Sequence, residues 1–133
     1  MSVGLLIITH GNVGTELLNT AKGVLRVCPV PVQVLRVHPD SNPERLLEEA
    51  SRLVSDLDNG DGVLVLTDMY GSTPSNIANR LPEDSPVTVV AGVNLPMLVR
   101  VLNYPRLSRE ELAEKAISGA RDGVVLCRPG NRH

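Results

Sequence analysis

The sequence is poor in aromatic residues. Among its 133 residues it has no tryptophan, no phenylalanine and two tyrosines, Tyr70 and Tyr104. Proteins that bind bases or sugar rings commonly stack them on aromatic side chains. Stacking of nucleic-acid bases or of sugars is therefore not expected of this chain.

Nor does the sequence have an excess of charge of one sign. Its 13 lysine and arginine residues are nearly balanced by 15 aspartate and glutamate residues, which gives a formal net charge of −2. Because the two kinds are interspersed, no basic region is available for nucleic acid or for an anionic membrane. Neither is expected as a partner.

Cysteine and long apolar runs are also scarce. Cys28 and Cys127 are far apart and belong to no CxxC motif or Cys/His cluster, so neither a disulfide scaffold nor a metal site is predicted. No cofactor is expected either, and both cysteines are expected to be packing residues. Residues 3–9 lack the basic region and the length of a signal peptide, and no run approaches the roughly 20 apolar residues of a membrane span. These absences predict a soluble, cytoplasmic protein.

What the sequence does contain is 42% hydrophobic residues, enough for the core of one domain. Short apolar runs rich in branched residues are typical of strands buried on both faces. Five such strands are predicted, at residues 4–9, 30–37, 62–67, 87–91 and 123–126.

Segments with helical spacing lie between these strands. Their starts carry capping signals: Asn42 and Thr73 each precede a proline, and Ser108 with Glu111 has the spacing of a capping box. The predicted helices are residues 14–26, 43–57, 74–81, 96–102 and 109–121.

Alternating strands and helices predict an α/β fold. We expect a doubly wound, mainly parallel five-stranded sheet with helices on both faces, right-handed crossovers and the strand order 2-1-3-4-5. This domain is expected to cover residues 1–128, followed by a flexible tail at residues 129–133.

Polar residues follow the first and third predicted strands. His10 comes directly after the first strand and Asp68 directly after the third. In an open parallel sheet, ligands bind beyond the carboxyl ends of the strands, where successive connections leave in opposite directions. Since these two strands are neighbours in the predicted order, His10 and Asp68 are expected side by side.

An aspartate beside a histidine determines which nitrogen of the imidazole ring can react. A neutral imidazole has one protonated nitrogen and one free lone pair, and the partner of the protonated nitrogen decides which nitrogen is free. We expect Asp68 to fix this choice, to leave the other nitrogen of His10 as a nucleophile for phosphorus, and to stabilise the positive charge that develops on the ring.

The loop after Asp68 offers hydrogen-bond donors to an anion. Gly71, Ser72 and Thr73 supply a flexible turn, two hydroxyls and the free amides of a helix N-terminus. Such donors suit phosphoryl transfer, whose transition state spreads negative charge over three oxygens. His10 and Asp68 are thus the predicted catalytic residues, and Gly71, Ser72 and Thr73 the predicted phosphoryl-binding residues.

At these residues the sequence resembles the enzyme IIA domains of the mannose family of the bacterial phosphoenolpyruvate-dependent sugar phosphotransferase system. Residues 6–11, 67–76 and 91–98 match the family's motifs in order and spacing, and the similarity extends over essentially the whole chain. The resemblance implies a phosphocarrier that accepts a phosphoryl group on His10 from phospho-HPr and passes it to an enzyme IIB during sugar uptake. It also implies that Asp68 orients His10 and that the Thr73 hydroxyl binds the phosphoryl group.

The resemblance carries an expectation about assembly as well. The family is dimeric and exchanges its last strand, so residues 123–128 are expected to pair with a partner chain, and contact with the membrane is expected only through permease partners. Two departures matter. Ser72 stands where many members have a second glycine, and the chain stops at His133 without a IIB domain, so the acceptor IIB is expected on a separate chain.

Two alternative functions stay open. A regulatory phosphoprotein that senses the phosphorylation state of the system would use the same histidine chemistry. The phosphotransfer subunit of dihydroxyacetone kinases shares the fold and the early histidine, although residues 92–96 favour the mannose family. A histidine phosphatase is disfavoured, because Thr9 stands where its Arg-His-Gly motif has arginine.

Overall fold

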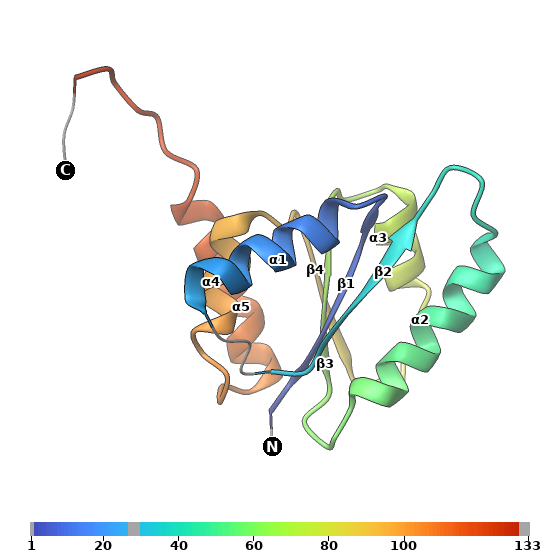
Figure 1. Ribbon diagram of the computed structural model, residues 1–133. Helices are drawn as coiled ribbons and strands as arrows, with labels where there is room; N and C mark the ends of the chain where they lie inside the picture. The colour runs from blue at the N-terminus through green and yellow to red at the C-terminus, as the bar shows by residue number, and fades with distance from the viewer. Residues whose placement is uncertain (1, 27–29, 131–133) are drawn as a thin grey trace.

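A parallel sheet with helices on both faces forms the protein (Figure 1). The structure is a computed structural model that describes residues 2–26 and 30–130. Its strands are β1 (Gly4–His10), β2 (Val32–Val37), β3 (Val63–Thr67) and β4 (Val87–Ala91). Its helices are α1 (Val13–Leu25), α2 (Pro43–Leu57), α3 (Thr73–Asn79), α4 (Leu95–Leu102) and α5 (Arg109–Asp122).

The strand order in the described part of the chain is β2-β1-β3-β4, with every neighbouring pair parallel. The predicted α/β class, the parallel sheet and the first four positions of the predicted order are confirmed. β1 is central: His10 is the register partner of Val37 in β2, and Ile8 is that of Thr67 in β3. The end of β1 therefore lies between the ends of two strands.

Two hydrophobic layers enclose the sheet. Leu5, Ile7 and Leu64 lie in the layer under α1, α4 and α5, whereas Leu6 and Ile8 lie in the layer under α2 and α3. Figure 1 shows these two groups of helices on opposite faces of the sheet. Both faces of the central strands are buried, which explains why their sequences are continuously apolar rather than alternating.

The helix starts follow from the capping residues. The Asn42 side chain accepts hydrogen bonds from Glu44 N and Arg45 N at 2.9 and 3.2 Å, and Ser108 and Glu111 form a complete capping box. Three helices start one residue before the prediction: α1 begins at Val13, α4 begins at Leu95, and α3 begins at Thr73 because its cap is Ser72. Ser72 has the extended backbone of a cap residue, with ψ of 173°, and Pro74 tolerates the second helical position as well as the first.

The predicted fifth strand is wrong. α5 ends at Asp122, and residues 123–130 leave the body of the protein without joining the sheet (Figure 1). Val124, Val125 and Leu126 are 77%, 68% and 88% exposed. The apolar pattern predicts a segment whose side chains are buried, but no strand in the part of the chain that the structure describes pairs with it. We call residues 124–128 the C-terminal arm.

The cysteines and the C-terminal tail were also the subject of predictions. Cys127 lies in the C-terminal arm and is exposed, so its predicted packing role is wrong. Cys28 and residues 131–133 of the predicted tail lie outside the described residues. In the described ranges, no helix combines the length and the apolar character needed to cross a membrane.

Candidate functional site

The structure brings His10 and Asp68 together at the carboxyl edge of the sheet. Asp68 Oδ2 accepts a hydrogen bond from the His10 backbone amide at 3.0 Å and lies 2.8 Å from His10 Nδ1. The His10 side chain is 47% exposed and that of Asp68 14%. An ionised carboxylate can only accept hydrogen bonds, so a neutral imidazole in this contact carries its proton on Nδ1 and keeps the free lone pair on Nε2.

The Asp68 carboxylate is anchored by the strand geometry. Strand pairing between β1 and β3 ends at Ile8 and Thr67, and the bond from the His10 amide to Asp68 Oδ2 continues the contact between these strands beyond that point. One oxygen thus binds both the main chain and the ring of His10. The ring is held relative to the strand that carries it.

On its other side, the loop after His10 is tied to β2. Gly11 N donates to Val37 O at 2.9 Å, and the Arg36 guanidinium donates to Asn12 Oδ1 at 2.9 Å. Asn12 occupies the cap position of α1 without making a side-chain cap bond, and its side-chain oxygen binds Arg36 instead. Sequence analysis missed Arg36, although a charged residue one position before the end of a strand is a signal for this sheet edge.

α1 begins close to β1. The Thr9 hydroxyl accepts a hydrogen bond from Gly14 N at 2.7 Å. A Cβ at position 14 would lie 2.6 Å from that hydroxyl and 2.8 Å from Ile7 Cγ2. Glycine at this position lets α1 start directly against the strand, and this fixes the direction of the chain just after His10.

The predicted phosphoryl-binding residues lie in the turn after Asp68. Gly71 has a φ of +83°, a left-handed conformation that favours glycine. Ser72 donates to Met69 O from its backbone amide at 3.2 Å and from its hydroxyl at 2.5 Å. Thr73 is exposed, and its hydroxyl has no hydrogen-bond partner in residues 2–26 and 30–130. Of the two hydroxyls, Ser72 therefore has its proton engaged and Thr73 does not.

The residues around the turn divide into a buried support and an exposed rim. Thr67 O accepts hydrogen bonds from Gly92 N and Val93 N at 2.8 and 2.9 Å, so the turn after β4 supports the end of β3. Met69 is 59% exposed and Tyr70 82%. Large exposed side chains next to a reactive group are suited to contact with another macromolecule.

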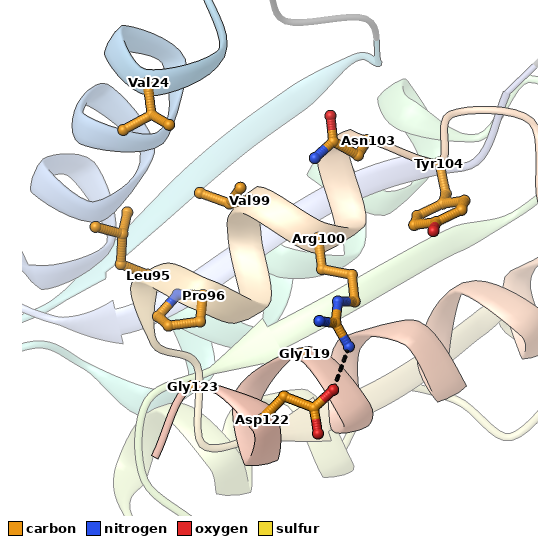
Figure 2. Close-up of a pocket in the computed structure, with 10 residues that line it drawn as sticks. All are labelled: Val24, Leu95, Pro96, Val99, Arg100, Asn103, Tyr104, Gly119, Asp122 and Gly123. Carbon is orange, nitrogen blue, oxygen red and sulfur yellow. Dashed lines mark hydrogen bonds and ion pairs between the residues drawn. The ribbon is translucent and has the colours of Figure 1, made fainter. Parts of the chain in front are cut away.

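A separate pocket lies between α1, α4 and α5 (Figure 2). Its volume is about 750 Å³. An ion pair of 2.7 Å between Arg100 and Asp122 forms part of its lining, and Val24 and Val99 provide apolar walls. None of the predicted site residues lines this pocket. In the described ranges, no group of three or more His, Cys, Asp or Glu residues is arranged to hold a metal ion.

Comparisons with known proteins point to one family. The family described as EIIA-man, PTS system fructose IIA component, matches residues 4–117. The mannose-specific EIIAB component of the PTS system of Escherichia coli strain K12 is 36% identical over 127 residues, which cover 93% of this chain and 39% of that protein. The chain thus spans about two fifths of the length of this relative.

Solved structures share the fold. A mannose/sorbose-specific IIA subunit of the phosphotransferase system from Enterococcus faecalis superposes with a TM-score of 0.87 at 22% identity, over 100% of both chains. A PTS IIA protein associated with the fucose utilization operon of Streptococcus pneumoniae has a TM-score of 0.77 at 27% identity, over 95% of this chain and 96% of its own. With the family match over residues 4–117 and the 36% identity to a mannose-specific relative, these findings establish that the chain belongs to the mannose-type enzyme IIA family of the phosphotransferase system.

Proposed function

We propose that this protein carries a phosphoryl group on Nε2 of His10, which it accepts from phospho-HPr and passes to an enzyme IIB in the sugar phosphotransferase system of the cytoplasm. The observation that carries the proposal is the 2.8 Å contact between Asp68 Oδ2 and His10 Nδ1. It assigns the proton to one nitrogen and leaves the other, on a half-exposed ring, free to react.

The chemistry is a displacement at phosphorus. The lone pair of His10 Nε2 attacks the phosphorus of the donor phosphohistidine, and the bond from phosphorus to the donor nitrogen breaks, which returns its electron pair to the donor ring. His10 keeps its Nδ1 proton, so its ring becomes positive as the new bond forms. The Asp68 carboxylate stabilises this charge through a charge-assisted hydrogen bond. Transfer to the acceptor repeats the step in reverse.

The turn after Asp68 is the proposed phosphoryl-binding segment. The Thr73 hydroxyl is a donor without a competing partner in the described chain. Gly71 lets the turn fold back through its positive φ, and the first amides of α3 are further donors. Ser72 would need to release Met69 O before its hydroxyl could bind an oxygen of the phosphoryl group.

A protein donor fits the surroundings of His10. Met69 and Tyr70 expose large apolar surfaces beside the site, as does Val13, which is 45% exposed at the start of α1. Apolar surface of this kind is covered by docking of another protein, not by binding of a small phosphate ester. This supports HPr and enzyme IIB as partners.

The C-terminal arm supports a homodimer. It exposes three consecutive apolar side chains, and the edge strand β4 is paired only with β3 in the described chain. An extended segment that lacks a neighbour and a sheet edge that lacks a strand can satisfy each other between two copies. We propose that the arms are exchanged between the subunits of a dimer.

The experiment is to incubate the protein with labelled phosphoenolpyruvate, enzyme I and HPr. We expect acid-labile label on the wild type and none on His10→Ala. A wild-type protein that stays unlabelled would refute the carrier function. Label that no enzyme IIB can remove would favour the second candidate, a regulatory phosphoprotein, and label that depends on dihydroxyacetone kinase would favour a subunit of that enzyme.

A further inference from the structure

Three polar side chains are buried in the described chain, and one of them differs from the other two. Thr9 and Ser75 have structural hydrogen bonds: the Thr9 hydroxyl accepts from Gly14 N at 2.7 Å, and the Ser75 hydroxyl accepts from Asn79 Nδ2 at 3.5 Å. Thr67 is 0% exposed, and its Oγ1 has no hydrogen-bond partner in the described chain. Its hydroxyl therefore serves neither the strand nor a helix cap.

A buried hydroxyl at position 67 lowers the stability of the fold unless it forms a hydrogen bond. The residues on the same side of β3, Val63 and Val65, belong to the apolar layer under α2 and α3. Valine has nearly the shape of threonine and would fill position 67 without a polar atom. A buried hydroxyl that finds no partner costs about 1–3 kcal/mol. A rule of packing that is broken next to a reactive group points to a role in that group's chemistry.

The matching acceptor belongs to the next residue. Asp68 Oδ1 is buried and has no hydrogen-bond partner in the described chain, whereas Oδ2 holds His10. The torsion that turns a carboxylate is broad and has no sharp minima. The two hydrogen bonds to Oδ2 resist this rotation from one side of the carboxylate, and a donor to Oδ1 would resist it from the other.

We propose that Thr67 is a positioning residue for Asp68: one buried water accepts a hydrogen bond from the Thr67 hydroxyl and donates one to Asp68 Oδ1. A buried water commonly makes two to four hydrogen bonds to polar groups of this kind. The carboxylate is then held at both oxygens. The proton stays on Nδ1 of His10, and Nε2 stays free. The consequence for phosphoryl transfer rests on the proposed function, whereas the consequence for the ring does not.

The test compares Thr67→Val, which removes only the hydroxyl, with Thr67→Ser, which keeps it. Nitrogen NMR of the labelled ring reports which nitrogen of His10 carries the proton, without any phosphoryl donor. We expect the wild type and Thr67→Ser to hold the proton on Nδ1, and Thr67→Val to give a mixture of both forms. Phosphorylation of His10 by phosphoramidate, a small donor that needs no docking, should be about fivefold slower in Thr67→Val, the effect of one lost hydrogen bond.

Thr9→Val is the matched control. It also removes the hydroxyl of a buried threonine, but it leaves Gly14 N without its acceptor. We expect its melting temperature to fall by about 5 °C or more, while that of Thr67→Val stays near the wild-type value. The two threonines should thus separate a structural role from a positioning role.

The outcomes distinguish the positioning role of Thr67 from the carrier function of His10. A Thr67→Val protein that folds and keeps the wild-type ring spectrum would overturn the role of Thr67, even if His10 accepts phosphate normally. If the ring spectra change as expected but neither the wild type nor any variant is phosphorylated, the carrier function is refuted and the positioning role of Thr67 is still supported. If Thr67→Val does not fold, a high-resolution crystal structure of the wild type decides: a water bonded to both Thr67 Oγ1 and Asp68 Oδ1 supports the proposal, and its absence refutes it.

Discussion

The two nitrogens of a histidine side chain are distinguished by what binds them. At His10 that partner is Asp68, at 2.8 Å from Nδ1, and Asp68→Asn keeps an acceptor there but removes the charge. Because a hydrogen bond to a charged group contributes about 1.5–3 kcal/mol, we expect phosphorylation by phospho-HPr to slow about ten- to a hundredfold. Rapid-quench labelling measures this. A rate within about twofold of the wild type would contradict the role of Asp68.

Sequence reasoning reached His10 and Asp68 because both follow buried strands that a doubly wound sheet brings together. It did not reach Arg36 or Thr67. The bond from Arg36 to Asn12 depends on which side of β2 the guanidinium takes at the sheet edge. The distinction between Thr67 and Thr9 depends on whether a helix amide lies within reach of the hydroxyl. Neither of these is encoded in residue spacing.

Among the secondary-structure elements, α5 shows how a local motif fixes a boundary. The backbone and side-chain hydrogen bonds with Ser108 lower the pKa of Glu111 from its ordinary value of 4.5. The lowered pKa means that the ionised form stabilises the folded state above the unfolded pKa, and that this contribution is lost as the pH falls through the folded pKa. The capping box should therefore weaken in acid.

Ser108→Ala tests this boundary. We expect the free energy of unfolding to fall by about 1 kcal/mol at neutral pH, and the difference from the wild type to shrink when the pH is lowered below about 4. Urea unfolding at the two pH values measures it. Ser55→Ala, at an exposed position inside α2, is the control and should lose no stability. An equal loss for Ser108→Ala at both pH values would contradict the link to Glu111.

The capping signals predicted the starts of α2 and α5, whereas α1, α3 and α4 each start one residue before the prediction. Asn42 and Ser108 each precede a helix at the predicted residue. α3 starts one residue before the prediction because Ser72, rather than Thr73, takes the extended cap conformation. Both residues are good caps in sequence, and only the backbone of the turn after Asp68 decides between them.

At the scale of the whole molecule, the C-terminal arm stands out because it exposes three consecutive apolar side chains that the rest of the described chain does not cover. An apolar strand pattern predicts that a segment pairs with another strand, but it does not predict whether that strand belongs to the same chain or to another one. This is why the fifth strand was expected in the sheet of the same chain and is not found there. In the proposed dimer, the arm of each subunit pairs with the other subunit.

The double variant Val125→Asp with Leu126→Asp tests the dimer. Charges on the arm would have to be buried in the exchange, so we expect the dissociation constant to rise at least tenfold, by about 1.4 kcal/mol or more, with unchanged helix content. Sedimentation equilibrium measures the assembly, and Cys127→Ser, also in the arm, should remain dimeric. A wild-type monomer, or a double variant that dimerises normally, would contradict arm exchange.

The central claim concerns a single atom: the phosphoryl group should reside on Nε2 of His10, because Asp68 binds Nδ1. Phosphorus–nitrogen NMR couplings of the ring-labelled, phosphorylated protein identify the attachment directly. The account predicts phosphorus bonded to Nε2, with the proton retained on Nδ1. Phosphorus on Nδ1, or on any residue other than His10, would contradict it.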